Sequence, residues 1–350
     1  MPWLAVSLLM LSQASPASAP ARQPMEIYFI DVLGGAATLV VTPDRESILL
    51  DSGWPGNDDR DPKRIERVLR DEAKLDHLDH LVTTHWHVDH FGGVEGLSHR
   101  VRIDHFWDRG LPDPSAADGD KARFPDGPAA NDPLGIAYRQ ASQGKRTTLA
   151  AGDRLPLKGP TEAVVLAASG LTIKNPQAPN NPLCDKAPAD QAVDSSDNAR
   201  SLVLRFRLGS FDFLDCGDLT WNIEKQLVCP QDLVGPVDLF QVTHHGMDIS
   251  NHPTFLETVA PTVAIMNNGP RKGGAPATVR RLGQLPSLQA AYQLHKNRSP
   301  EPGDNTDPTL IANPVGAEGN FIRVTIEPDG SRYTVQVGTG GGTKPTFRSK

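Results

Sequence analysis

The sequence predicts an α+β fold in which two mixed β-sheets pack face to face, with helices on the outside. Short β-branched segments alternate with helical ones, and this rhythm occurs twice, once in each half of the chain. The chain has 350 residues, of which 38% are hydrophobic and 22% charged. Such a composition is typical of a soluble globular protein and provides enough apolar residues for a large core.

The predicted strands are apolar, β-branched or aromatic runs bounded by turn residues. We expect them at residues 25–32, 37–42, 47–50, 80–83, 102–106, 163–168, 202–206, 211–214, 239–242, 263–266, 321–326 and 333–337. The first three are joined by tight turns, which indicates an antiparallel sheet edge. The segment at 80–83 leads directly into a cluster of histidines, so that cluster lies at the carboxyl end of a strand.

The predicted helices show apolar residues at helical spacing, as Ile65, Val68 and Leu69 do. We expect helices at residues 63–72, 134–143, 219–228, 253–259 and 278–285. Two stretches rich in Pro, Asp and Gly, residues 108–133 and 176–197, are long for loops in a compact domain, and such loops are usually functional or disordered. We therefore divide the chain into one domain at 22–340, with insertions at about 108–145 and 170–199, and a flexible tail at 341–350.

Residues 1–21 are predicted to be a signal peptide. Trp3–Leu11 is an apolar run too short to span a bilayer, and an Ala-x-Ala pattern ends at Ala21, where we expect cleavage. The protein would then be exported, to the periplasm or the medium. No Lys or Arg precedes the run, so a disordered apolar tail or a misplaced start codon is the alternative. No later segment is apolar enough to cross a membrane.

Charge and cysteine content argue against a dedicated nucleic-acid-binding protein and against a disulfide-rich protein. The formal net charge is -7 and no basic run occurs, so we predict no dedicated nucleic-acid-binding patch. Cys184, Cys216 and Cys229 are too few for a disulfide framework. One pair could bridge in an oxidising compartment, but we expect buried free cysteines.

The strongest chemical signal is the segment Thr84-His85-Trp86-His87-Val88-Asp89-His90. Imidazole and carboxylate groups suit Zn²⁺ and other first-row divalent ions. Alternation along the chain sends His85 and His87 to the same side, where both can bind one ion. Asp89 and His90 belong to the following turn and can face a second ion. The alternative, a polar loop with chance histidines, is disfavoured because histidine is rare.

Three further clusters follow predicted strands. Asp218 can bridge two ions, although its alternative role is to cap the next helix. His244 and His245 can complete the shell of the second ion, or can be two solvated loop histidines. Asp51 is expected behind the ligands, orienting the histidine loop through hydrogen bonds.

Together, His85-x-His87-x-Asp89-His90, Asp51, Gly217-Asp218 and His244-His245-Gly246 resemble the motifs of the metallo-β-lactamase superfamily, in the same order. Residues 196–204 are similar to a segment of the ComEC-like DNA-uptake proteins, and the His-His-Gly motif resembles that branch and the choline-phosphate esterases. The resemblance spans about residues 25–285. It implies a four-layer αββα sandwich with metals at one edge.

The chain departs from the family pattern in two places. No histidine lies between His105 and His244, where most members supply a third ligand to the first ion, so we place Asn198 or Ser201 near that ion. The turn after Asp31 lacks the acidic residue typical of the ComEC-like branch. The many membrane spans of DNA-uptake channels are also missing, so the chain is not itself such a channel.

The resemblance implies a hydrolase with two divalent cations, Zn²⁺ or else Mn²⁺. A metal-bound hydroxide would attack a phosphorus or carbonyl centre, with Asp89 as ligand and orienter of the nucleophile. We predict His244 as the ligand, because it comes first after the strand, and His245 as the group that protonates the leaving group. Asn268 and Lys272 are candidates for binding a substrate anion, although Lys272 could equally be a solvated loop residue.

The expected substrate is a phosphodiester or related phosphoester, as a small molecule or an oligomeric ester. Two alternatives remain open. One is hydrolysis of a lactone, lactam or thioester by the same fold. The other is a catalytically silent metal-binding module, which the missing third histidine motivates.

Overall fold

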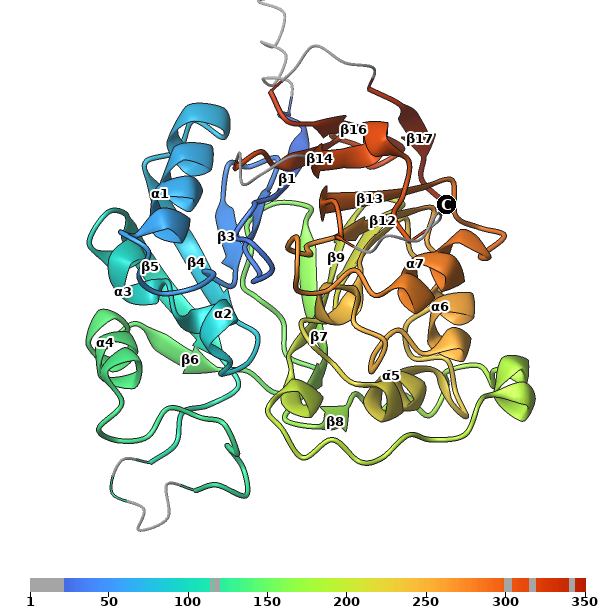
Figure 1. Ribbon diagram of the computed structural model, residues 1–350, viewed down its shortest axis with the longest axis horizontal. Helices are drawn as coiled ribbons and strands as arrows, with labels where there is room; N and C mark the ends of the chain where they lie inside the picture. Colours follow the sequence, from blue (N-terminus) through green and yellow to red (C-terminus); the bar gives the residue numbers. More distant parts are fainter. Residues whose placement is uncertain (1–21, 114, 116–119, 299–303, 315–318, 340–343) are drawn as a thin grey trace, which may run out of the picture.

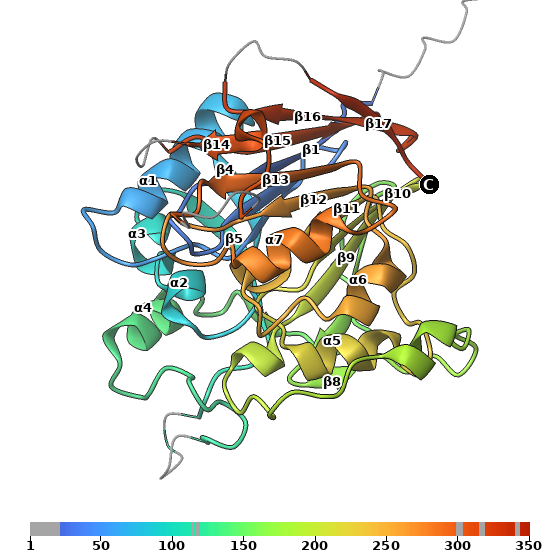
Figure 2. The ribbon, with the colours of Figure 1, turned by 45° about the vertical axis from the view of Figure 1, so that its right-hand side comes forward.

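A computed structural model of the chain describes residues 22–113, 115, 120–298, 304–314, 319–339 and 344–350. The predicted signal peptide at residues 1–21 lies outside these ranges. The described residues form a nine-stranded and an eight-stranded sheet that face each other, with helices over the outer face of each (Figures 1 and 2). The predicted sandwich of two mixed sheets with outer helices is therefore confirmed.

The nine-stranded sheet joins both ends of the described chain. Its order is β17 (Thr346–Arg348), β16 (Arg332–Val337), β15 (Ile322–Ile326), β1 (Met25–Phe29), β2 (Thr38–Val41), β3 (Ser47–Leu50), β4 (His77–Thr83), β5 (Arg102–Asp108) and β6 (Arg146–Thr148). Strand β1 pairs with β15 as well as β2. The initial hairpins thus lie inside the sheet, and the predicted edge was wrong because the C-terminal strands cover it.

The eight-stranded sheet is built from the second half of the chain. Its order is β14 (Ile311–Asn313), β13 (Ala290–His295), β12 (Val263–Met266), β11 (Leu239–Gln241), β10 (Phe211–Asp215), β9 (Val203–Leu208), β7 (Glu162–Ala168) and β8 (Leu171–Thr172). Strands β10 to β14 are parallel, as are β3 to β6 in the other sheet. The carboxyl ends of such strands are where α/β proteins commonly place their ligand sites.

The α-helices divide between the two outer faces. They are α1 (Arg60–Arg67), α2 (Val88–Phe91), α3 (Val94–Ser98) and α4 (Pro133–Ala141) beside the first sheet, and α5 (Trp221–Val228), α6 (Pro253–Val259) and α7 (Pro276–Gly283) beside the second (Figure 1). None of the helices in the described ranges is long and apolar enough to span a bilayer. Helix α1 continues as a π-helical turn at Val68–Glu72.

Three apolar cores separate these four layers. The central core contains residues of both sheets, such as Phe29 and Phe213. A second core lies under α1, α3 and α4 and includes Tyr28, and a third lies under α5 to α7. Since Phe29 and the adjacent Tyr28 enter different cores, β1 is buried on both faces. This explains why its sequence is apolar at nearly every position.

Two predictions about the chain outside the cores were wrong. Cys184 and Cys229 form a disulfide, and Cys216 is the free, buried cysteine among the described residues. The bond joins the 176–197 segment to the end of α5, a proximity that the cysteine count could not reveal. The tail predicted at 341–350 includes β17, which pairs with β16. Phe347 is buried, and burying its ring fixes this segment to the core.

Glu224 on α5 is fully buried and joins this helix to the start of α6, where one carboxylate oxygen accepts the His252 backbone N–H at 2.8 Å. Burial raises the pKa of Glu224 from 4.5 to about 7, although the hydrogen bonds act in the opposite direction. In the folded protein this carboxyl group therefore keeps its proton at a pH where the unfolded chain has released it.

This difference makes the stability depend on pH. The contribution of the Glu224 proton is complete below the unfolded pKa of 4.5 and is lost as the pH rises through about 7. Glu224→Gln carries no titrating group. We therefore expect its free energy of unfolding to rise relative to the parent by about 3 kcal/mol between about pH 4 and about pH 8. Urea denaturation with a chelator present measures this difference.

Glu257→Gln, at an exposed position on α6, is the matched control and should differ from the parent by a constant amount across this pH range. Parallel pH profiles for Glu224→Gln and the parent would contradict the buried-proton explanation.

Candidate metal centre

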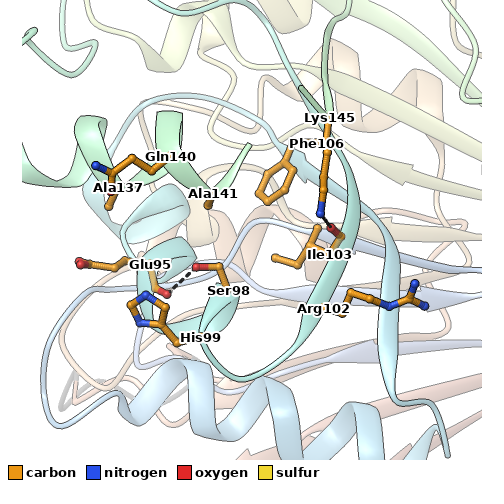
Figure 3. Close-up of a pocket in the computed structure, with 10 residues that line it drawn as sticks. All are labelled: Glu95, Ser98, His99, Arg102, Ile103, Phe106, Ala137, Gln140, Ala141 and Lys145. Carbon is orange, nitrogen blue, oxygen red and sulfur yellow. Dashed lines mark hydrogen bonds between the residues drawn. The ribbon is translucent and has the colours of Figure 1, made fainter. Parts of the chain in front are cut away.

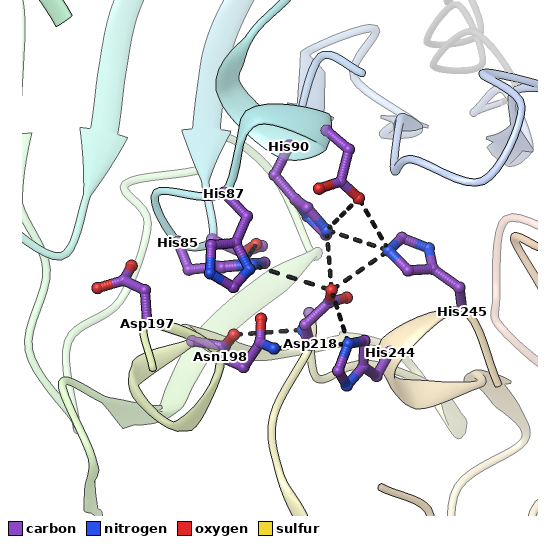
Figure 4. Close-up of polar contacts among 12 residues, drawn as sticks. His85, His87, His90, Asp197, Asn198, Asp218, His244 and His245 are labelled. Atoms are coloured by element: carbon purple, nitrogen blue, oxygen red, sulfur yellow. Dashed lines mark hydrogen bonds and ion pairs between the residues drawn. The ribbon is translucent and has the colours of Figure 1, made fainter. Parts of the chain in front are cut away.

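Side chains that follow three strands meet at one edge of the sandwich (Figure 4). His85 and His87 follow β4, and α2 continues that loop with Asp89 and His90. Asp218 follows β10, and His244 and His245 form a 3₁₀ turn after β11 at Thr243–Gly246. These side chains form two groups with potential ligand atoms within 4.8 Å of one another, namely Asp89, His90, Asp218 and His245, and His85, His87 and Asp218.

The first of these groups is the tighter one. Asp218 Oδ2 lies 3.2 Å from His90 Nε2 and 3.2 Å from His245 Nε2. The two imidazole nitrogens are themselves 3.2 Å apart. Asp89 Oδ2 is 3.2 Å from His245 Nε2 and 3.4 Å from His90 Nε2. Such mutual distances are compatible with four ligand atoms around one cation, each about 2 Å from it.

The second group is more open. His85 Nε2 lies 3.9 Å from Asp218 Oδ2, and this buried nitrogen has no hydrogen-bond partner within the described ranges. Asn198 Nδ2 is 3.5 Å from His244 Nε2, while Asn198 Oδ1 is buried and likewise unpartnered there. Ser201 accepts the Asp218 backbone N–H through its Oγ at 3.2 Å. Of the two residues expected near this group, Asn198 thus contacts His244 beside Asp218, and Ser201 supports Asp218.

Asp51 lies behind the histidine loop. Its oxygens accept the Thr84 backbone N–H at 2.8 Å and the Thr84 hydroxyl at 2.7 Å. Oδ2 also lies 2.6 Å from His90 Nδ1, so the other nitrogen of this ring faces the cluster. The backbone of Asp51 adopts a left-handed φ of 61°, which Asp tolerates better than most residues. The single carboxylate therefore fixes both the loop and a ring.

Glycines allow the loop to pack closely. A Cβ at Gly93 would lie 2.1 Å from the Ser52 carbonyl oxygen, and one at Gly35 would lie 2.5 Å from the Asp89 carbonyl oxygen. Neither position has room for a side chain. The His85–His90 loop is thus held against the turns that follow β1 and β3, which limits its freedom to move away from the cluster.

The structure places His245, the second of the paired histidines, among the potential metal ligands. His245 Nε2 lies within the tighter group, whereas His244 belongs to neither group and lies 3.5 Å from Asp218 Oδ2. His244 Nδ1 contacts Ser250 Oγ at 3.1 Å. Both histidines have left-handed backbone conformations, with φ of 54° and 53°. The chain therefore turns sharply after β11, and order along the strand does not decide which ring enters the cluster.

The two residues proposed for binding an anion differ in accessibility. The Lys272 ammonium pairs with Asp89 Oδ2 and lies 5.1 Å from the Trp54 ring centre. Its side chain is 34% exposed. Asn268 is fully buried, and its Nδ2 donates to the His295 carbonyl at 2.8 Å. The prediction for Asn268 was therefore wrong, because its amide joins two strand ends and cannot reach a substrate.

The charges in the cluster depend on one another. Burial opposes ionisation of Asp218, but His245, His90 and His244 outweigh it and hold its pKa well below the usual range. Burial also opposes protonation of His90, yet Asp218, Asp51 and Asp89 raise its pKa well above 6.5. Burial dominates for His244, whose pKa falls to about 4. Buried carboxylates thus require positive charge at this position, which imidazolium or a cation can supply.

Two contacts near the cluster were not predicted from the sequence. His87 Nε2 lies 3.1 Å from Asp126 Oδ2, and Asp197 Oδ2 accepts the Trp86 backbone N–H at 2.7 Å. Both carboxylates come from the long segments that were predicted as loops. No strand end or spacing rule relates Asp126 to the histidine motif, so sequence reasoning could not find it.

A separate pocket lies between α3, β5 and α4 (Figure 3). Its lining includes Ser98, Phe106 and Lys145. None of its lining residues belongs to the two ligand groups. We therefore do not connect it with the chemistry of the cluster.

Several solved structures resemble this chain weakly. YhfI of Bacillus subtilis, a metallo-β-lactamase fold protein, is 11% identical with a TM-score of 0.42, covering 77% of this chain and 96% of YhfI. Igni18 of Ignicoccus hospitalis, a metallo hydrolase, is 12% identical with a TM-score of 0.43, covering 79% and 97%. CmlA of Streptomyces venezuelae, a diiron β-hydroxylase, is 16% identical with a TM-score of 0.38, covering 71% and 45%.

The chain spans about half the length of CmlA, with 45% and 53% covered in its two structures. No curated protein sequence matched this chain. Residues 30–153 match the sequence profile of the metallo-beta-lactamase superfamily, a range that includes Asp51 and the His85–His90 loop. With the two facing sheets and their outer helices, this match identifies the metallo-β-lactamase fold.

Proposed function

We propose that the chain is a metal-dependent hydrolase that binds two divalent cations at the cluster. The observation that carries this proposal is the convergence of side chains from three strand ends, those of β4, β10 and β11, at Asp218 Oδ2. The first site would be held by His85, His87 and Asp218, and the second by Asp89, His90, Asp218 and His245. Imidazole and carboxylate ligands favour Zn²⁺, with Mn²⁺ as the alternative.

The residues fit such cations. His85 Nε2 is buried and unpartnered in the described structure, which is costly for a polar atom unless a ligand satisfies it. His90 Nε2 and His245 Nε2 lie 3.2 Å apart, and a cation would allow both nitrogens to be unprotonated acceptors. His244 Nε2, 3.5 Å from Asp218 Oδ2, stands beside the first site and can replace the histidine that most family members supply.

When bound, two cations would activate water at neutral pH and stabilise negative charge that develops on the substrate. The protein groups have separate tasks. Asp51 fixes His90, and Asp89 orients the water through the oxygen that meets His245 and Lys272. The Lys272 ammonium would then exchange part of its contact with Asp89 for an anionic oxygen of the substrate.

Lys272 favours an anionic phosphodiester over a neutral lactone, lactam or thioester as the substrate. We propose small or oligomeric phosphoesters, consistent with the ComEC-like motif at residues 196–204. A net charge of -7 argues against polymeric nucleic acid. Carbonyl hydrolysis remains the second candidate, because cations beside Asp89 would polarise a carbonyl as well as a phosphoryl group.

Metal loading and turnover test this proposal. We expect the purified protein to bind about two equivalents of Zn²⁺ or Mn²⁺ and to hydrolyse bis(p-nitrophenyl) phosphate. His85→Ala and Asp89→Ala should each weaken metal binding and lower kcat by roughly a hundredfold or more, because each removes a ligand. Elemental analysis and steady-state kinetics measure both effects.

His99→Ala, at an exposed position outside the cluster, is the control and should behave as the parent does. If His85→Ala and Asp89→Ala retained parental metal content and turnover, the chain would not be a metal-dependent hydrolase. Parental metal binding without turnover of phosphodiesters or lactones would favour the silent metal-binding module.

Lys272→Met tests the preference for an anion. We expect KM for bis(p-nitrophenyl) phosphate to rise by about tenfold, since a hydrogen bond to a charged group contributes about 1.5–3 kcal/mol. Hydrolysis of an uncharged lactone, where detectable, should change much less. Lys344→Met, at an exposed C-terminal position, is the control. Equal losses on both substrates would remove the argument for phosphoesters.

We also propose that the protein is exported after cleavage behind Ala21. The Cys184–Cys229 disulfide supports this, because structural disulfides persist mainly in oxidising compartments. Expression of the full chain in a bacterium should place mature protein beginning at Arg22 outside the cytoplasm. N-terminal sequencing of the fractions measures this, and an intact N-terminus found in the cytoplasm alone would contradict it.

A further inference from the structure

Four histidines at the cluster share one feature, which is that a Thr, Ser or Asp side chain contacts one nitrogen of the ring; they are His85, His87, His90 and His244. The fifth, His245, differs, because its buried Nδ1 has no hydrogen-bond partner in the described structure. His90 Nδ1 meets Asp51 Oδ2 at 2.6 Å, and His244 Nδ1 meets Ser250 Oγ at 3.1 Å. His85 Nδ1 lies 3.1 Å from Thr84 Oγ1. Contacts of this kind fix the tautomer and orientation of a metal-binding imidazole. They leave the opposite nitrogen of each ring directed toward Asp218.

For His87 the corresponding partner is Asp126. Its Oδ2 lies 3.1 Å from His87 Nε2, and the side chains are 42% and 28% exposed, respectively. Asp126 is not part of the ligand group that His85, His87 and Asp218 form within 4.8 Å. The carboxylate therefore contacts the imidazole from outside the site, in the position of a hydrogen-bond acceptor rather than of a ligand.

Asp126 also connects the two inserted segments. The same Oδ2 accepts the Asp197 backbone N–H at 2.9 Å. Asp197 is fully buried, accepts the Trp86 N–H at 2.7 Å and forms an ion pair with Arg109. Trp86 stands between His85 and His87 in the sequence. One continuous network of polar contacts thus joins the metal-binding loop to Asp126 and Asp197, one from each inserted segment.

We propose that Asp126 is a positioning residue for the first site, an inference that rests on the metal centre proposed above. Its carboxylate holds the His87 ring so that the opposite nitrogen is left for the cation. Because Asp126 and Asp197 are joined, binding of a cation by His87 also orders residues 120–133 and 194–198 together. The inserted segments are then arranged around the site when it is loaded.

This arrangement strengthens the first site, whose group of potential ligands holds three residues against four in the second. A carboxylate that accepts a hydrogen bond from an imidazole N–H raises the basicity of the other ring nitrogen, and loss of such a partner typically weakens metal binding by 10–100-fold. Asp51 supplies this effect at His90 through a buried contact. Asp126 supplies it at His87 from a segment that lies far from the motif in sequence.

Three variants separate the charge of Asp126 from its hydrogen bonds. Asp126→Asn keeps an oxygen acceptor and removes the charge, Asp126→Glu restores a carboxylate, and Asp126→Ala removes both acceptors. Asp120→Asn is the matched control, since Asp120 lies in the same segment and pairs with Arg123 at 3.5 Å. The affinity for Zn²⁺ is measured for both equivalents by chelator competition, together with the melting temperature of the metal-free proteins.

We expect Asp126→Asn to weaken one of the two Zn²⁺ equivalents by roughly 10–100-fold and to leave the other unchanged. Asp126→Glu should lie closer to the parent, and Asp120→Asn should match it. The metal-free melting temperatures should agree, which a purely structural role would not allow. Hydrogen exchange should show that Zn²⁺ protects residues 120–133 and 194–198 in the parent and not in Asp126→Ala.

Parental affinities for both equivalents in Asp126→Asn would overturn the role of Asp126 while leaving the metal centre intact. Equal weakening of both equivalents, with a lower metal-free melting temperature, would overturn it in favour of a structural role. Absence of Zn²⁺ binding by the parent would overturn the metal centre itself, and this inference with it.

Discussion

The arrangement of the whole edge depends on one buried carboxylate oxygen, Asp218 Oδ2. It lies 3.2 Å from His90 Nε2 and from His245 Nε2, 3.5 Å from His244 Nε2 and 3.9 Å from His85 Nε2. An ion at a buried position is costly unless opposite charge and hydrogen bonds surround it. The two sheets must therefore bring their strand ends to the same point, and the central apolar core sets the separation at which they can do so.

Many of the regular elements could be predicted because the pattern of apolar residues along each segment indicates which of its faces are buried. In β1, Phe29 faces the other sheet and Tyr28 faces the helices, so the strand is apolar on both sides. Two of the missed strands lacked such a signal. Strand β6 (Arg146–Thr148) is polar and short, and β17 (Thr346–Arg348) is a strand because it pairs with β16. Pairing of this kind depends on distant partners, which local composition does not encode.

The sequence predicts a site residue where that residue comes soon after a predicted strand, because strand ends meet at one edge of the sandwich. His85, His87 and Asp218 were found from that rule, and the structure brings them together. The rule does not describe what happens within a turn. His245 enters a ligand group although His244 comes first after the strand, since both residues have left-handed backbones. The amide of Asn268 is occupied by its contact with the His295 carbonyl. Asp126 illustrates the limit most clearly, since an irregular segment carries it to His87.

The pairing of β1 with β15 has a consequence for biosynthesis. Met25 lies opposite Ile326, so one of the first strands to leave the ribosome acquires this neighbour only after most of the chain has been made. Until then, a strand with Phe29 on one face and Tyr28 on the other exposes apolar surface and an unpaired edge, which favours aggregation. A chaperone that binds the nascent chain near residue 29 would protect it during this interval.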